Sequence, residues 1–321
     1  MTPPSGYAVV NYHGILPSDH KNPDLFLDGN LLRAETFRKQ LRFLKSHYRI
    51  IHPEDFRAAI EQTKPLPART VLLTCDDGLL NTLTDMLPVL HSEGVPCLFF
   101  ITGASCTDNP GMLWYEELYR IMRIKPLRAE LQLPEAKRAA HPASENFQSR
   151  WWKTVEKASQ LDGKSREQWM ALVRGDSNPA QQFTSEKRWR LLNLTELRQL
   201  ANSGMSIGAH TLSHPVLSQC SQEEARREIG ASKSQLEHAV GRPVWAFAYP
   251  FGNPATIGDR ELRLARDAGF SCAFLNVEHW NDALTNLFAL PRIHVSLRTT
   301  LPEFAAHLSG LHTRLQRAVS G

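Results

Sequence analysis

The chain has 321 residues, of which 42% are hydrophobic and 22% charged, with a net charge of +4. This is the composition of a globular protein that is long enough for one large domain or two smaller ones. Lysine and arginine form no dense block, which argues against nucleic acid as a partner, and no apolar run has the length of a membrane span.

The cysteines and the first residues bear on the cellular compartment. The five cysteines are an odd number without CxxC spacing, so we expect free thiols in a reducing environment. The opening MTPPSGYAVVNYHG contains no basic segment followed by an apolar one, so we expect no signal peptide. These features predict a cytoplasmic protein, although a chain trimmed of its leader would look the same.

Short apolar runs alternate with amphipathic stretches along most of the chain. The expected strands cover 7–13, 70–75, 95–103, 205–210, 244–250 and 271–275. The expected helices cover 34–47, 82–94, 194–204, 221–241 and 259–270, with Thr195 as the N-cap of 194–204. Strands that alternate with helices of this length predict an α/β fold built from parallel β/α units.

Residues 104–193 interrupt this rhythm, and we interpret them as a mainly helical insertion within a single domain that covers 1–321. The insertion contains five of the seven tryptophans, Trp114, Trp151, Trp152, Trp169 and Trp189. It follows a strand end and could therefore form a wall over a site there, or contact an anionic membrane surface. The alternative is that these rings pack a small core of their own. Trp151 and Trp152 are about 100° apart on a helix, so at least one should be partly exposed.

Polar residues follow the ends of several predicted strands. His13 follows the first strand, Asp76 and Asp77 follow 70–75, and His210 ends 205–210. The stretch 249–251, Tyr-Pro-Phe, comes at the end of 244–250. In parallel β/α folds the C-terminal strand ends meet at one edge, where chemistry collects, so we expect a site there.

A metal site is the chemistry that these residues favour. His210 and His214 are four apart in GAHTLSHP, so one helical turn or a tight loop would bring both to one ion. An HxxxH pattern also arises by chance, but two imidazoles with a carboxylate suit a divalent metal such as zinc. A cation would neutralise one acid of the Asp76–Asp77 pair and leave the other as a base, with Gly78 allowing the turn. A glycosidase needs its two carboxylates about 5 Å or more apart, flanking a sugar bond, which adjacent residues do not suit.

Three stretches make the sequence resemble the polysaccharide deacetylase family (NodB homology, carbohydrate esterase family 4). TCDDG is similar to the family motif T-F-D-D-G, HTLSHP to H-[ST]-x-x-H-P, and AYPFG to R-x-P-[FY]. The opening VVNYHGI and the later LPRIHVS resemble a bacterial branch of exopolysaccharide-type deacetylases. The resemblance implies a deformed (β/α) barrel that hydrolyses the N-acetyl group of an amino sugar with the help of a metal.

The resemblance also implies roles for individual residues. The metal ligands would be Asp77, His210 and His214, with Zn²⁺ as the expected ion and Co²⁺ or Ni²⁺ as alternatives. Asp76 would be the general base, and a backbone N–H near Phe251 would assist the oxyanion. The remaining residues expected to contact substrate are His13, Tyr249, Pro250 and Phe251.

The sequence departs from the family pattern in two places. The arginine of the third motif, which orients the base, is replaced by Ala248, and Arg292 is a candidate substitute; the alternative is an exposed or carboxylate-paired arginine elsewhere. The general acid would be His294, with His13 as the other candidate. We expect Arg292 and His294 to share a strand face only if a bulge intervenes, so that one of them points away.

Three functions are compatible with these features. The first is an N-deacetylase acting on an amino sugar in a polysaccharide or in a glycan or lipid-linked precursor. The second is a deformylase or other small-acyl amidohydrolase that acts on a lipid-linked sugar. The third is a catalytically silent carbohydrate-binding module, against which Asp76 argues, because binding alone needs no spare base beside the metal.

Overall fold

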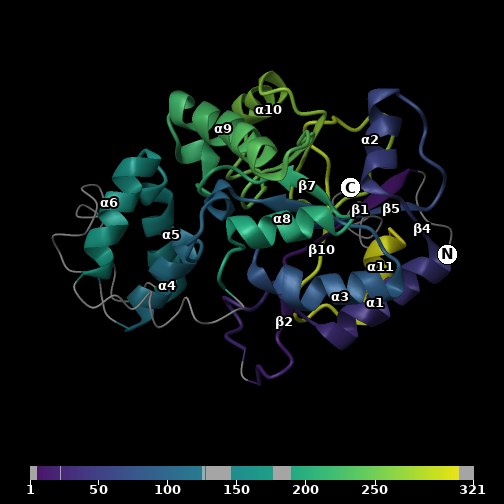
Figure 1. Cartoon of the computed structure of the whole chain (residues 1–321), viewed down its shortest axis with the longest axis horizontal. Coiled ribbons are helices and arrows are strands. Elements are labelled where there is room, and N and C mark those ends of the chain that lie inside the picture. Colours follow the sequence, from purple (N-terminus) through teal and green to yellow (C-terminus); the bar gives the residue numbers. More distant parts are fainter. Residues whose placement is uncertain (1–5, 22, 125–126, 128–145, 176–188, 311–321) are drawn as a thin grey trace, which may run out of the picture.

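The computed structural model describes residues 6–21, 23–124, 127, 146–175 and 189–310, and its centre is a curled, eight-stranded parallel sheet (Figure 1). The order is β10-β1-β5-β6-β7-β8-β9, with β4 beside β5. The strands are β1 (Tyr7–Tyr12), β4 (Arg49–Ile50), β5 (Thr70–Cys75), β6 (Leu98–Ile101), β7 (Ser206–Ala209), β8 (Ala246–Ala248), β9 (Cys272–Phe274) and β10 (Ile293–His294). The pairing is parallel throughout, so the C-terminal strand ends lie along one edge.

The segment 290–294, which contains β10, links β9 to β1. Leu290 forms a parallel bridge with Phe274 of β9, while β10 pairs with Val10 and Asn11 of β1. The sheet is thereby curled into a deformed barrel, which confirms the expected fold class.

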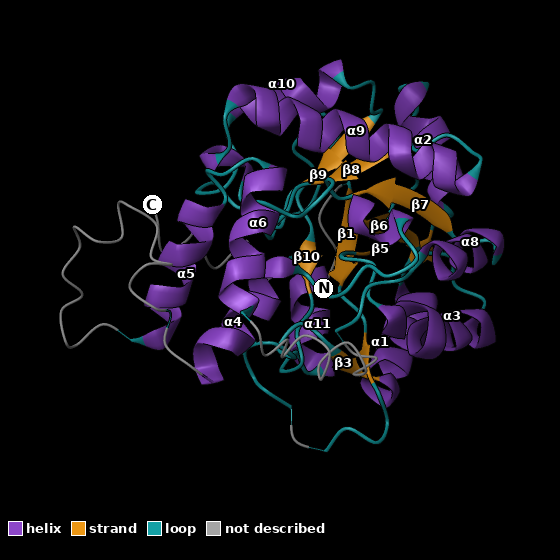
Figure 2. Ribbon diagram, turned by 60° about the vertical axis from the view of Figure 1, so that its left-hand side comes forward, coloured by secondary structure: helices purple, strands orange, loops and turns teal. Residues whose placement is uncertain are grey.

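Helices surround the sheet (Figure 2). They are α1 (Ala34–His47), α2 (Pro53–Glu61), α3 (Leu87–Glu93), α8 (Leu194–Asn202), α9 (Gln222–Val240), α10 (Asp259–Asp267) and α11 (Leu301–Leu308), with a π-helical turn, η1 (Thr82–Met86), before α3. Short 3-10 turns, η2 (Gly103–Cys106) and η5 (Leu217–Gln219), and a small pair of strands, β2 (Ile15–Leu16) and β3 (Leu32–Arg33), complete the body.

The strands bury both of their faces, as parallel strands in this class do. In β1, Ala8 and Val10 belong to an apolar cluster that includes residues of the outer helices. Val9 belongs to a second cluster, which collects Leu72 and Phe274 from other strands inside the curl of the sheet. The two clusters explain why the strands read as continuous apolar runs rather than as an alternating pattern.

Most predicted elements are confirmed, with shifted ends. Helix α1 and strand β5 have the predicted bounds, whereas several strands are shorter than the apolar runs that predicted them. The predicted cap at Thr195 is wrong. The side chain of Asn193 accepts a hydrogen bond from the Glu196 N–H, and the Glu196 side chain accepts one from the Asn193 N–H. This reciprocal capping box begins the helix at Leu194.

The described part of the insertion forms three helices, α4 (Trp114–Ile124), α5 (Phe147–Ala158) and α6 (Gly163–Arg174), grouped at one end of the molecule (Figure 1). Residues 128–145 and 176–188 lie outside the described residues. Four tryptophans are buried in a cluster of their own, Trp114, Trp151, Trp169 and Trp189. Trp152 is partly exposed, which confirms that the adjacent pair cannot be buried together.

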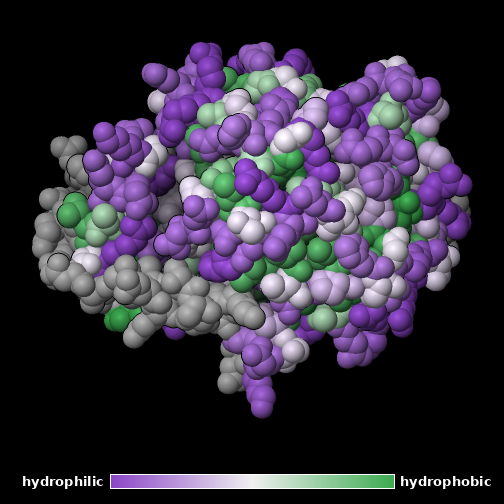
Figure 3. All heavy atoms as spheres, viewed as in Figure 1, coloured by the Kyte–Doolittle hydropathy of each residue, from purple (hydrophilic) through white to green (hydrophobic). Residues whose placement is uncertain are grey.

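Polar side chains cover most of the face shown in Figure 3, and apolar residues lie among them in small groups. None of the helices in the described ranges combines the length and the apolar character that crossing a bilayer requires.

Candidate active site at the strand ends

The polar residues singled out from the sequence lie together at the C-terminal edge of the sheet. His13 follows β1, Asp76 and Asp77 follow β5, and His210 follows β7. Because these strands are parallel neighbours or near neighbours, one edge collects residues that are as far as 197 positions apart in sequence (13 to 210). All four side chains are buried.

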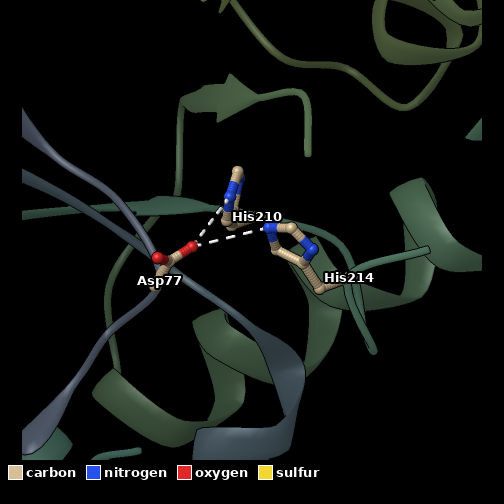
Figure 4. A group of neighbouring side chains, drawn as sticks. All are labelled: Asp77, His210 and His214. Carbon is tan, nitrogen blue, oxygen red and sulfur yellow. Dashed lines mark ion pairs between the residues drawn. The ribbon is translucent and has the colours of Figure 1, made fainter. Parts of the chain in front are cut away.

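Asp77, His210 and His214 form a compact triad (Figure 4). Asp77 Oδ1 lies 3.5 Å from His210 Nε2 and 3.5 Å from His214 Nε2. One possible ligand atom from each of the three residues lies within 4.8 Å of the others. Two imidazole nitrogens and one carboxylate oxygen are a donor set that suits a divalent transition metal with positions left for water and substrate.

The protonation of the triad is compatible with metal binding. His210 Nδ1 lies 2.7 Å from the Ala248 carbonyl, which accepts a hydrogen bond from it, so loss of the Nε2 proton would leave the lone pair of that nitrogen free for a cation. Burial would raise the pKa of Asp77, but hydrogen bonds from His210 and His214 hold it well below its usual value. The carboxylate is therefore ionised, as a metal ligand must be. These residues fit a divalent cation.

The backbone around the triad is strained. Four of the six non-glycine residues with positive φ in the described ranges surround the site: Asp77 (76°), Thr211 (63°), His214 (57°) and Phe251 (61°). Such conformations cost free energy and persist where the surroundings impose them, often at functional sites. Gly78 is also left-handed at φ 78°, so the predicted change of chain direction after the acidic pair is confirmed.

The loop from His210 to His214 is fixed by hydrogen bonds to side chains rather than by a helical turn. Glu228 of α9 accepts hydrogen bonds of 2.9 Å from the N–H groups of Leu212 and Ser213. Thr211 Oγ1 accepts one from the His214 N–H at 2.9 Å. Arg166 of α6 forms an ion pair with Glu228 at 3.4 Å, so the insertion contributes to the support of this loop.

Asp76 lines the same cavity as the triad but has its own hydrogen-bond partners. Arg292 donates two hydrogen bonds to its carboxylate, Nη1 to Oδ1 and Nη2 to Oδ2, each of 2.7 Å. Asn11 Nδ2 donates a third to Oδ2 at 3.0 Å. Burial would raise the pKa of Asp76, but the charge and hydrogen bonds of Arg292 with the charge of His210 lower it overall. The acid is thus ionised and oriented.

The expectation that Arg292 and His294 point to different sides is wrong. Arg292 is fully buried against Asp76, and the His294 ring lies 5.2 Å from the ring of His13, centroid to centroid. Residues two apart on a strand share a face, so no bulge is needed to bring both to the site. Burial, followed by the charges of His13 and Arg292, lowers the pKa of His294 to about 3.

A cavity of about 400 Å³ opens beside the triad and the acidic pair. His13 and Phe251 line it, and His13 Nε2 lies 4.0 Å from Asp76 Oδ2. Tyr249 also lines it, although its hydroxyl donates a hydrogen bond to the Phe288 carbonyl. Pro250 and His294 are absent from the described lining.

Aromatic rings form one wall of this cavity. The Phe251 ring lies 4.8 Å from that of His214, 5.3 Å from that of Tyr115 and 5.0 Å from that of Trp152, centroid to centroid. Trp151 also lines the cavity, although it is only 5% exposed, and it donates a hydrogen bond from Nε1 to the Tyr115 carbonyl. The insertion and the loop after β8 therefore build this wall together.

Several residues of the site were not singled out from the sequence. Asn11 is a polar residue inside an apolar strand, and that anomaly could have indicated it. Tyr115, Glu116 and Asn276 line the cavity but belong to segments without a recognisable motif. Only their position in the folded chain identifies them.

Comparison with known proteins supports the motif assignment. The profile of the polysaccharide deacetylase family matches residues 166–273. Over 109 residues the chain is 28% identical to poly-β-1,6-N-acetyl-D-glucosamine N-deacetylase of Escherichia coli (strain K12). This match covers 34% of the chain and 15% of that relative, so it spans a small part of the relative's length.

Solved structures show the same fold at low sequence identity. The Streptococcus pyogenes deacetylase PplD in complex with acetate aligns with a TM-score of 0.60 and 17% identity, covering 96% of this chain and 99% of that one. IcaB from Ammonifex degensii aligns with a TM-score of 0.58 and 17% identity, covering 96% and 98%.

The profile match includes the HTLSHP motif with His210 and His214. The TCDDG motif, which precedes the matched range, supplies the third member of the triad. The motifs and the profile match over 166–273 make the chain similar to the polysaccharide deacetylase family, and its curled parallel sheet is the fold of the solved deacetylases.

Proposed function

We propose that this protein is a metal-dependent hydrolase that removes the N-acetyl group from an amino sugar in a polysaccharide or in a glycan or lipid-linked precursor. The observation that carries the proposal is the division of the acidic pair. Asp77 faces His210 and His214, whereas Asp76 is held beside them by Arg292 and Asn11. A binding site alone would not need the second, separately oriented acid.

Asp77, His210 and His214 would hold a divalent cation, with zinc as the proposed ion and Co²⁺ or Ni²⁺ as alternatives. Bound there, the cation would polarise the amide carbonyl and make a water molecule more acidic. Asp76 accepts the proton of the attacking water at a carboxylate oxygen, because it is ionised and oriented by Arg292. The backbone N–H of Phe251 is the proposed donor to the amide oxygen as negative charge develops there.

Protonation of the departing amine needs a second group. His13 is the proposed donor, because it lines the cavity while its Nε2 lies 4.0 Å from Asp76 Oδ2. His294 packs against the His13 ring and, with its low pKa, is neutral near pH 7. We propose that His294 positions His13. A loss of turnover in His294→Ala as large as that in His13→Ala, with KM unchanged in both, would instead assign the proton donor to His294.

The substrate class follows from the family and the cavity. Aromatic rings stack on the apolar faces of sugar rings, and the wall containing Phe251 and Trp152 offers such a surface. The E. coli relative is named for an N-acetyl-D-glucosamine polymer, which supports an N-acetylated amino sugar here as well.

Release of acetate and formate from N-acetylated and N-formylated amino-sugar oligomers would test the proposal. We expect acetate release that stops with a chelator and returns when Zn²⁺, Co²⁺ or Ni²⁺ is added. Formate release without acetate release would favour the deformylase alternative. Binding of the oligomer without release of either acid would favour a silent binding module.

A further inference from the structure

Buried polar atoms without hydrogen-bond partners gather around the cavity. Within the described residues, four such atoms belong to its lining: His13 Nδ1, His214 Nδ1, Glu116 Oε2 and Asn276 Oδ1. The two histidines belong to the site already described. An unpaired buried polar atom is costly and uncommon in native proteins, and a ligand that supplies the missing partner is one explanation.

Glu116 is the most unusual member of this group. It lies in the first turn of α4, its residue is 9% exposed, and it lines the cavity. Its Oε2 is buried and has no hydrogen-bond partner within the described part of the chain. Burial, followed by the charges of Asp77 and Asp28, raises the pKa of Glu116 well above its usual value.

The neighbouring Glu117 shows how a structural acid behaves at the same place. Its carboxylate accepts hydrogen bonds from Arg174 Nε and Nη2, each of 2.8 Å. The helix dipole favours acids in the first turn of α4, which applies to both residues. The dipole does not explain why Glu116 is buried without a partner, whereas Glu117 has two hydrogen bonds.

We propose that Glu116 is a substrate-binding residue whose carboxyl group forms hydrogen bonds with a hydroxyl group of the amino sugar. This inference rests on the proposed function for the identity of the ligand. A carboxyl group kept neutral by burial has one O–H donor and acceptor capacity left, which matches a hydroxyl that both donates and accepts. The aromatic wall would hold the apolar face of the sugar, and Glu116 would fix its orientation.

The test compares three variants of the metal-loaded protein, Glu116→Gln, Glu116→Leu and the matched control Glu117→Gln, on an N-acetylglucosamine oligomer. Glu116→Leu should raise KM about tenfold with little change in kcat, because it removes a hydrogen bond made to the bound substrate. Glu116→Gln should stay within about threefold of the native KM, because an amide also donates and accepts.

Melting temperatures separate this role from a structural one. Glu116→Leu should keep or raise the melting temperature, because the free protein no longer buries an unpaired oxygen. Glu117→Gln should lower it and leave KM unchanged, because it breaks the pairing with Arg174. A lower melting temperature with an unchanged KM in Glu116→Leu would overturn the proposal.

Deoxy substrates and direct binding complete the test. One monodeoxy N-acetyl sugar should lack the hydroxyl group that Glu116 binds. On that sugar the native protein should lose about tenfold in kcat/KM relative to the complete sugar, whereas Glu116→Leu should have the same kcat/KM on both sugars. If no monodeoxy sugar shows this pattern, the proposal fails.

Calorimetry with the oligomer on Asp76→Asn protein measures binding apart from turnover. Weaker binding caused by Glu116→Leu would support Glu116 even if the native protein released no acetate, which would defeat only the proposed function. Equal binding by Asp76→Asn protein with and without Glu116→Leu, or binding by neither of them, would overturn the Glu116 assignment.

Discussion

Replacement of Arg292 by glutamine tests how the proposed general base, Asp76, is kept ionised and oriented. The guanidinium is fully buried and donates two hydrogen bonds of 2.7 Å to Asp76 and one of 2.8 Å from Nε to the Leu275 carbonyl. Removing one member of a buried ion pair costs about 3–5 kcal/mol. We therefore expect Arg292→Gln to lower the free energy of unfolding near pH 8 by about that amount, measured by denaturant titration.

The same substitution should change the pH dependence in a defined direction. In the native protein the lowered pKa of Asp76 means that its ionisation stabilises the fold above the ordinary pKa, about 4, and that this stability is lost as the pH falls through the lowered value. Without Arg292, burial dominates and the pKa of Asp76 rises. The destabilisation should then be largest at neutral and alkaline pH and smaller in acid.

Activity offers a second measurement of this shift. The acidic limb of the kcat/KM profile should move to higher pH in Arg292→Gln, because a protonated Asp76 cannot accept the proton of water. Arg292→Lys keeps the charge but not the bidentate geometry. The acidic limb of its kcat/KM profile should therefore lie between those of the native protein and Arg292→Gln. An unmoved acidic limb with native kcat/KM in Arg292→Gln would refute the proposed role of Arg292.

Four further substitutions test other parts of the site. Asp76→Asn should retain bound metal but lose about 10²–10⁴ in kcat, and near-native kcat with full metal content would place the base elsewhere. His214→Ala should lower metal content, measured by elemental analysis, and activity together, whereas full metal retention would contradict the ligand assignment. Trp152→Ala should reduce activity on a polymeric N-acetyl sugar more than on a short one, because this ring is partly exposed in the cavity wall, whereas Trp151→Ala should mainly lower the melting temperature. Equal losses on both substrates after Trp152→Ala would indicate packing instead.

The parts of the site that the sequence predicts are those with short-range signals. Asp76 and Asp77 end an apolar run, and His210 and His214 are close in one motif, so their types and spacing alone indicate a metal with a free base. Parallel strands end at one edge of a sheet, and this rule is enough to predict that the two motifs lie together.

Contacts between distant segments could not be predicted with the same certainty. Arg292 meets Asp76 across 216 positions, and only the segment 290–294, which links β9 to β1, brings it there. Asn193 replaced Thr195 as a helix cap because its side chain and that of Glu196 satisfy each other's backbone N–H groups. Glu116 carried no signal, because one glutamate among many in the sequence gives no indication that it will be buried unpaired.

The adjacent acids show why both kinds of information are needed. Two buried carboxylates one peptide bond apart would repel strongly if they shared an environment. The left-handed turn at Asp77 and Gly78 sends the chain away after Asp76, so that each acid meets different partners: two imidazoles for Asp77, and a guanidinium with an amide for Asp76. Because each carboxylate has its own compensating groups, both can stay ionised in a buried site. The strain at Asp77 is therefore the local cost of placing the proposed metal ligand beside the proposed base.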